Sequence, residues 1–523
     1  MTEKTEYTTA LHGSVQEVYA TSEEKIETGS SETVVREETI VTDVIELNEK
    51  SHVVEQQQEI DVNGVQHNFV RSNEESRLVR KLDFIYVMPF IAILNFLQFF
   101  DKSALNYSAA MGIKADTGLV GDQFSWLGSI FYLGYLLFQV PSSYFIQKFP
   151  LSKYVGSLII LWGLVLLLTH KAHNFSQLAA LRFLLGFFEA GIYPSCVMLI
   201  SALYRRSEQS GRIGVIYMCN GIAMILGGLI SYGIAQLHSH GLTPWQWIMI
   251  ILGAITMAFG ILCFFFMLDN PKDKVLKLSP EEEKIVDKRT ADNAVIKTKE
   301  FKMSHVYESL KEGRYYAFNF ISLLINLQNS ALGTFNTTIT AGFGFSSLQA
   351  ILLTIPCGVA TCLFIIIAVW INRRHGHTLI LGCVFLAIAI LGLILLLVIP
   401  VQRVKLVGLV LVWSYCASFV MLLTSIANNV TGYTKKIFYS SSLMVFYTLG
   451  NFIGPFMMVS KQAPLYIGGM IGYIVADAIC IVLFLYARWS MVKKNRERLM
   501  TSAKIQVVDD MTDVENKNFI YRP

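Results

Sequence analysis

The chain has 523 residues, of which 53% are hydrophobic and 16% are charged, and its mean hydropathy is +0.47. Soluble multidomain proteins are not this apolar, so the composition indicates a polytopic membrane protein with the lipid bilayer as its solvent. The formal net charge of +4 is spread along the chain rather than gathered in arginine-rich clusters, and it gives no support to a nucleic-acid partner.

Residues 1–70 hold 15 acidic residues against 4 basic ones and contain no Trp. Such a composition cannot bury enough apolar surface to offset the chain entropy that is lost on folding. We therefore predict a disordered, acidic cytoplasmic tail over residues 1–82. Its role is either regulation, through phosphorylation of Ser and Thr or ubiquitination of Lys4 or Lys25, or simple solvation without a specific partner.

From residue 84 onward, apolar segments recur that approach the roughly 20 residues needed to cross a bilayer core of roughly 30 Å. Basic residues gather in alternate loops, and the positive-inside rule places those loops and both chain termini in the cytoplasm. We count twelve segments, near residues 84–108, 124–145, 154–170, 177–203, 211–236, 246–267, 316–339, 348–371, 378–400, 405–427, 439–460 and 465–487.

The longest interruption separates six segments from six, and it is polar and strongly charged. The predicted fold is therefore an all-α polytopic membrane protein with twelve transmembrane helices in two six-helix halves. Secondary transporters have this layout, with the substrate site at mid-membrane between the halves. The predicted parts are an N-terminal half over 83–268, a cytoplasmic linker over 269–314, a C-terminal half over 315–488 and a cytoplasmic C-terminal tail over 489–523.

Two charged residues, Asp101 and Lys102, stand in the stretch FLQFFDKSALN of the first apolar segment. Charges inside membrane helices are costly, and they are usually retained where they face a water-filled cavity or pair with a partner or substrate. The alternative is that the pair only marks the outer end of a helix that starts near residue 84. The following residues continue as plausible helix to Lys114, which places the pair well inside a long helix.

The fourth segment carries a second pair, Arg182 and Glu189, seven residues apart. That spacing puts both side chains on one helix face, about 10 Å apart along the axis. Arg182 lies close enough to its helix start to be an interfacial side chain that extends toward water. Glu189 has apolar neighbours on both sides, and the alternative to a functional role there is a structural hydrogen bond to a neighbouring helix.

The stretch RFLLGFFEAGIYPSCVMLISALYRRSEQSGRIG, residues 182–214, resembles the fourth helix and following loop of the major facilitator superfamily. More narrowly, it is similar to the anion:cation symporter group and its fungal allantoate permease family. Supporting matches are FFDKSALNYS at 99–108, YLLFQVPSSYF at 135–145 and GNFIGPFMMVSKQAPLY at 450–466. Two departures matter. The loop after the second segment reads QKFPLSKY, where many members of the superfamily place a glycine and further basic residues. The usual Asp-Arg pair of the first helix is Asp101 and Lys102 here, and lysine lacks the planar fork that binds a carboxylate bidentately.

The resemblance implies that acidic residues of the first and fourth helices couple transport to protons, and these positions are Asp101 and Glu189. Burial and a nearby cation shift the pKa of a carboxyl in opposite directions, so a carboxyl can bind and release a proton when its surroundings change. Our hypothesis is that Lys102 and Arg182 are the cationic partners of these carboxyls and also attract an anionic substrate.

Further candidates are polar groups inside apolar helices. Tyr135 resembles a family tyrosine that hydrogen-bonds the substrate, and Asn451 resembles a polar position of the eleventh helix; an ordinary membrane tyrosine and a helix-packing amide are the alternatives. The seventh segment carries Asn326, Gln328 and Asn329, which are too many amides for a lipid-facing surface. At least one of them should line the cavity, and Gln328 is our candidate substrate-binding residue.

We therefore predict a proton-coupled symporter that imports a small organic anion, such as a carboxylate, a vitamin or a sulfur-containing acid, by alternating access. A transport-inactive nutrient sensor with the same fold is the alternative, although a sensor need not keep both carboxyls. The histidines lie at helix ends or in loops, so we predict no enzyme activity, no metal site and no cofactor apart from the coupling proton. We expect a monomer in the plasma membrane of a fungal cell, with the endoplasmic reticulum or vacuole membrane as the alternative.

Overall fold

The computed structural model describes residues 57–60, 66–69, 72–204, 206–237, 241–270, 272–273, 276–292, 302–500, 511–517 and 519–523. These residues fall into two units, residues 1–73 and residues 74–523. In the first unit, strands β1 (Gln57–Ile60) and β2 (Gln66–Phe69) pair antiparallel, with Gln57 opposite Phe69. Most of the acidic tail predicted over 1–82 lies outside the described residues.

The second unit is helical, and its first half begins with two short elements before the first membrane helix. The helices of this half are α3 (Asn73–Lys81), the π-helix η2 (Leu82–Tyr86), α4 (Met88–Ala110), α5 (Ile113–Asp116), α6 (Gln123–Lys148), α7 (Leu151–Leu168), η3 (Thr169–Lys171), α8 (Phe175–Glu189), α9 (Ile192–Leu203), α10 (Arg206–Ala235) and α11 (Pro244–Phe266).

Two linker helices, α12 (Pro280–Asp292) and α13 (Met303–Lys311), lead into the second half. The helices of this half are α14 (Gly313–Gly342), α15 (Ser347–Leu352), α16 (Thr354–His375), α17 (Thr378–Val398), η5 (Gln402–Val404), α18 (Lys405–Val412), α19 (Tyr415–Asn429), α20 (Tyr433–Ile453), η6 (Gly454–Met457), η7 (Ser460–Gln462) and α21 (Ile467–Met500). The last helix continues past residue 488, where the sequence predicts that the half ends.

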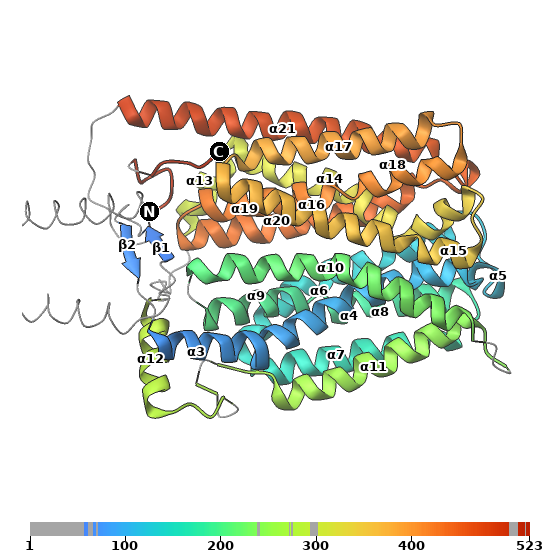
Figure 1. The fold of residues 1–523 in the computed structure, drawn as a ribbon, viewed down its shortest axis with the longest axis horizontal. Helices are drawn as coiled ribbons and strands as arrows, with labels where there is room; N and C mark the ends of the chain where they lie inside the picture. The colour runs from blue at the N-terminus through green and yellow to red at the C-terminus, as the bar shows by residue number, and fades with distance from the viewer. Residues whose placement is uncertain are drawn as a thin grey trace, which may run out of the picture. The chain divides into compact units, whose positions relative to one another are not determined.

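Nine helical stretches of the described chain are long and apolar enough to cross a membrane. Five of these join consecutive helices: α3, η2 and α4; α7 and η3; α8 and α9; α15 and α16; and α18 and α19. Helices α6, α14 and α20 are not among the nine, but they are 26, 30 and 21 residues long and complete a set of twelve. The predicted fold of twelve helices in two halves is confirmed, and Figure 1 shows α4 to α11 beside α14 to α21.

The two halves repeat one pattern of helix pairing. In the first half α4 packs against α10 and α7 against α11; in the second half α14 packs against α20 and α17 against α21. Each matching pair joins helices at equivalent positions within its half. Internal repeats of this kind are typical of secondary transporters and allow one half to move as a body against the other.

We call the end of the bundle that carries α12 and α13 the linker end (Figure 1). The two halves contact each other at the opposite end. There Asn106 of α4 accepts a hydrogen bond from the Thr337 backbone N–H at 2.9 Å, and the Asp122 carboxylate accepts one from the Ser460 N–H at 3.0 Å. The Phe124 ring also meets the Phe335 ring edge-on, with centroids 5.2 Å apart.

A glycine contact joins the halves on their side, where α10 packs against α16. A Cβ added to Gly221 would lie 2.4 Å from Cys362 Sγ and 2.9 Å from the Gly358 carbonyl oxygen. Only a residue without a side chain permits this backbone approach, as small residues commonly do between membrane helices. The backbones of the two halves therefore approach each other closely here.

We predict that Gly221→Ala lowers the free energy of unfolding by about 1–3 kcal/mol, because the added methyl group forces α10 and α16 apart. Gly233→Ala on the same helix is the matched control, since nothing lies within 4 Å of a Cβ added there. Thermal unfolding of the purified variants in detergent measures both. Equal melting temperatures for the two variants would contradict the close approach.

Candidate functional site

A cavity of about 120 Å³ lies between the two halves, and residues of both halves line it. For comparison, a cavity of about 150 Å³ accommodates benzene. The lining combines charged, amide and aromatic side chains, which suits a small ligand that has both a charge and an apolar body. The polar lining residues include Asn95, Gln98, Lys102, Arg182, Asn220, Asn329, Ser330 and Thr334, and the aromatic ones are Phe99, Phe131, Tyr132, Tyr135, Tyr193, Tyr217, Phe419 and Tyr447.

On the side of the cavity formed by the first half of the protein, Lys102 of α4 forms an ion pair with Glu189 of α8. Lys102 Nζ lies 2.7 Å from Glu189 Oε1, and the Glu189 side chain is fully buried. The ammonium group also lies over the rings of Phe131 and Tyr135 on α6, at 5.4 and 5.9 Å from their centroids. Attraction to the ring faces adds to the ion pair, so three helices hold the lysine head.

The guanidinium group of Arg182 lies in the same cavity, two helical turns before Glu189 on α8. Its Nη2 atom is buried and has no hydrogen-bond partner among the described residues. A buried donor without a partner is costly, and the cost is greater for a charged group. Arg182 is therefore a cationic residue of the cavity lining with one donor that is not satisfied by the described residues.

Asp101 and Lys102 are adjacent in sequence but point to different places. Successive helix residues are rotated by about 100°, and Asp101 faces α11 while Lys102 faces the cavity. The Asp101 carboxylate is buried and accepts a hydrogen bond from Thr256 Oγ1 at 3.0 Å. Its other oxygen, Oδ1, has no hydrogen-bond partner in the described part of the chain. Asp101 therefore does not line the cavity, although its neighbour Lys102 does. It has no ion pair among the described residues.

Three of the five predicted substrate-binding residues line the cavity: Lys102, Arg182 and Tyr135, whose ring lies near the lysine. Gln328 and Asn451 do not line it. Gln328 donates to both carboxylate oxygens of Asp477 on α21, at 2.9 and 3.2 Å, and so lies on the other side of α14.

Asn329 is the amide of the seventh segment that reaches the cavity. Asn451 accepts a hydrogen bond from Asn329 Nδ2 at 2.8 Å, and Tyr415 donates to Asn329 Oδ1 at 2.8 Å. Asn451 therefore positions a cavity residue rather than lining the cavity itself.

The sequence reasoning missed most of the aromatic lining. Tyr193 and Tyr217 share a hydrogen bond between their hydroxyl groups at 2.8 Å, and Tyr447 lies across the cavity on α20. Aromatic residues are common in membrane helices, so no local pattern separates those that face a cavity from those that face lipid. A polar residue within an apolar run, such as Asn95 or Asn220, was the available signal.

A bundle of twelve membrane helices in two halves, with charged residues around a cavity between them, defines a secondary transporter. The family model of the Major Facilitator Superfamily matches residues 91–458, and the chain belongs to this superfamily. Among its relatives is the thiamine pathway transporter THI73 of Saccharomyces cerevisiae, which is 34% identical over 469 residues, covering 88% of this chain and 89% of that one.

Allantoate permease of Saccharomyces cerevisiae is 30% identical over 477 residues, which cover 86% of this chain and 87% of the permease. The predicted membership of the fungal allantoate permease family is thereby confirmed. Solved structures with the same fold include a bacterial homologue of the human lysosomal transporter Spinster (16% identity) and the xylose transporter XylE from E. coli (14% identity). Each has a TM-score of 0.58 and matches 78% of this chain and 97% of its own.

We predict that Lys102→Met and Glu189→Gln each destabilise the protein, because each leaves a buried group without its partner. The double variant should be more stable than the sum of the single effects implies, by about 0.5–3 kcal/mol. The measurement is thermal unfolding of the four proteins in detergent. The control is Lys102→Met combined with Asp477→Asn, and the effects of these two substitutions on stability should add. If the effects of Lys102→Met and Glu189→Gln also add, the ion pair is absent.

Proposed function

We propose that this protein is a proton-coupled symporter that imports a small organic anion by alternating access. The observation that carries the proposal is Arg182, a cavity-lining residue whose buried Nη2 atom has no hydrogen-bond partner among the described residues, in the same site as the Lys102–Glu189 ion pair. A carboxylate or similar anion offers the acceptor oxygens that this guanidinium lacks.

Binding of an anion and binding of a proton would favour each other at this site. An anion held by Arg182 and reaching Lys102 competes with Glu189 for the ammonium group 2.7 Å away. Glu189 is fully buried, and a buried carboxylate that loses its cation is stabilised by taking up a proton. The coupling is reciprocal, because a proton on Glu189 also frees Lys102 for the anion.

Asp101 is our second proton carrier. Its carboxylate is buried and has, among the described residues, one hydrogen bond, from Thr256, so that Oδ1 can hold a proton. Its backbone adjoins that of Lys102, so a movement of α4 that follows anion binding changes the surroundings of both side chains together. With both carboxyls protonated, the loaded cavity carries little net charge.

The aromatic lining supports a substrate with a flat or apolar body. Eight aromatic residues line the cavity, and their ring faces favour planar groups. The named relatives are a thiamine pathway transporter and an allantoate permease. Because Arg182 is cationic, we propose an anion such as allantoate or a ring carboxylate for this chain rather than the cation thiamine.

We place the protein in the plasma membrane with both termini in the cytoplasm, as the basic loops of the sequence suggest. The second candidate function is a transport-inactive nutrient sensor. The unpartnered guanidinium favours ligand binding in either case, and transport distinguishes the two.

We expect one anion from a panel of labelled carboxylates and sulfonates to enter expressing cells faster at an external pH of about 5 than at about 7, the range in which a buried carboxyl titrates. Glu189→Gln should abolish this pH dependence, and Asp101→Asn should lower proton stoichiometry. Thiamine is the cationic control. Surface-localised protein that transports nothing at either pH would favour the sensor, and unchanged stoichiometry in both variants would exclude these carboxyls as carriers.

Arg182→Lys should raise the KM for the transported anion by about tenfold, a loss of about 1.4 kcal/mol, because lysine keeps the charge but not the two-pronged contact. Arg182→Gln, which removes the charge, should raise KM further. Initial uptake rates at several anion concentrations measure both. A lysine variant with wild-type KM would show that the anion does not contact Arg182 bidentately.

A further inference from the structure

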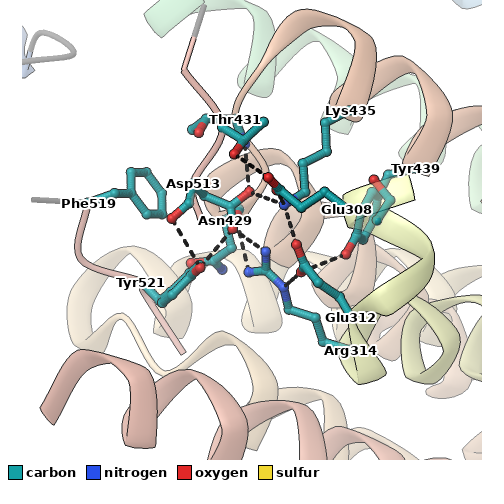
Figure 2. Close-up of polar contacts among 12 residues, drawn as sticks. Glu308, Glu312, Arg314, Asn429, Thr431, Lys435, Tyr439, Asp513, Phe519 and Tyr521 are labelled. Atoms are coloured by element: carbon teal, nitrogen blue, oxygen red, sulfur yellow. Dashed lines mark hydrogen bonds and ion pairs between the residues drawn. The ribbon is translucent and has the colours of Figure 1, made fainter. Parts of the chain in front are cut away.

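The last residues of the chain dock on the second half at the linker end. Residues 511–517 and 519–523 of this segment are described, and residues 501–510, which join it to α21, lie outside the described residues. Figure 2 shows the segment approaching a cluster of charged side chains. We call the receiving surface the socket, and its members are Glu308, Arg314, Asn429, Lys435, Asn495 and Arg498.

An acidic anchor fixes the start of the segment. Asp513 is fully buried, is hydrogen-bonded by Arg314 and lies 3.0 Å from Lys435 Nζ (Figure 2). Burial alone would raise the pKa of the Asp513 carboxyl, but the Arg314 and Lys435 cations outweigh it and hold that pKa below its ordinary value. The anchor is therefore charged at physiological pH, and Thr512 beside it donates to Glu308 Oε2 at 3.0 Å.

Two asparagines hold the backbone near the end of the segment. Asn495 of α21 accepts from the Tyr521 N–H at 2.9 Å and donates to the Tyr521 carbonyl at 2.8 Å. Asn429 of α19 accepts from the Arg522 N–H at 2.7 Å and donates to the Arg522 carbonyl at 3.0 Å. Each side-chain amide thus forms hydrogen bonds with both the backbone N–H and the backbone carbonyl of one residue, as binding sites for extended peptides do.

An aromatic anchor completes the contact. The Tyr521 side chain is buried between two guanidinium groups, with Arg314 4.6 Å and Arg498 4.7 Å from the ring centroid. Its hydroxyl donates to Asp513 Oδ2 at 2.7 Å, so the acidic and aromatic anchors also contact each other. The segment is therefore held by two buried side chains, Asp513 and Tyr521, and by backbone hydrogen bonds to Asn495 and Asn429. Contacts of this kind are specific to its sequence and conformation.

The socket gathers the linker ends of several helices. Glu308 belongs to linker helix α13, Arg314 to α14 and Lys435 to α20, and Lys435 Nζ lies 2.6 Å from Glu308. Helices α14 and α20 also carry the cavity residues Asn329 and Tyr447. Glu312, next to α14, forms ion pairs with both Arg314 and Lys435. Asp513 forms ion pairs with the same two residues, so the docked segment adds a second link between these ends of α14 and α20.

We propose that the socket is a peptide-binding site whose ligand is residues 511–523 of the same chain, and that this ligand docks reversibly and clamps the linker ends of α14 and α20. Docked, it holds the two helices and α13 in a fixed arrangement. Released, it leaves Arg314 and Lys435 with the linker carboxylates alone, and the helix ends loosen. This clamp does not depend on the nature of the substrate or of the coupling ion.

The test uses the full chain with a protease site placed within residues 501–510, cleaved after purification. The cleaved segment should stay with the wild-type protein on gel filtration and exchange slowly with a fluorescent synthetic peptide of residues 511–523. Asp513→Asn should speed its release by at least about tenfold, since a charged hydrogen-bonded pair is lost. Lys517→Gln, at an exposed position of the same segment, is the matched control and should behave as wild type.

Hydrogen exchange of the cleaved protein gives the second readout. After the segment is washed out, backbone amides near Arg314 and Lys435 should exchange faster, and added peptide should restore their protection. Three results would overturn the proposal: release from wild type as fast as from the Asp513→Asn protein, a wild-type segment that never exchanges with the peptide, or helix ends whose exchange does not respond to its removal. Because no step involves uptake, these outcomes are separate from those of the transport experiments.

Discussion

The ion pair of Lys102 with Glu189 is the interaction on which the site depends. A charge buried away from water costs several kcal/mol unless another group compensates it, and Glu189 is fully buried. The pair links α4 to α8, and Lys102 lies over the Phe131 and Tyr135 rings of α6. It also leaves Arg182 as the cavity cation without a hydrogen bond at Nη2 among the described residues, and so shapes a site for an anion.

The same constraint explains why three of the twelve helices are less apolar than the rest. Helices α6, α14 and α20 fall outside the nine clearly apolar spans, and all three contribute to the cavity lining. Polar residues of α14 pair across helices, Asn329 with Asn451 of α20 and Gln328 with Asp477 of α21. In a bilayer such groups are tolerated because they face protein or the cavity instead of lipid.

The two ends of the bundle are held in different ways. At the end opposite the linker, contacts such as Asn106 with Thr337 cross between the halves and have to break if the halves move apart there. At the linker end, the charges of Arg314, Lys435 and Asp513 bind the second half to its own terminal segment. The first arrangement is suited to a gate, and the second to keeping one half rigid while it moves.

The sequence by itself determined the membrane class, the twelve helices, the two halves and the family, because apolar length and motif order are local properties of the chain. It also singled out Lys102, Arg182 and Glu189, since charges inside apolar runs are conspicuous. Only the tertiary structure decided that Lys102 pairs with Glu189, that Asp101 turns toward Thr256, that Asn329 rather than Gln328 reaches the cavity, and that Asp513 docks on Arg314. Each of these depends on helix rotation and on contacts between residues distant in sequence, and adjacent residues on a helix differ in direction by about 100°.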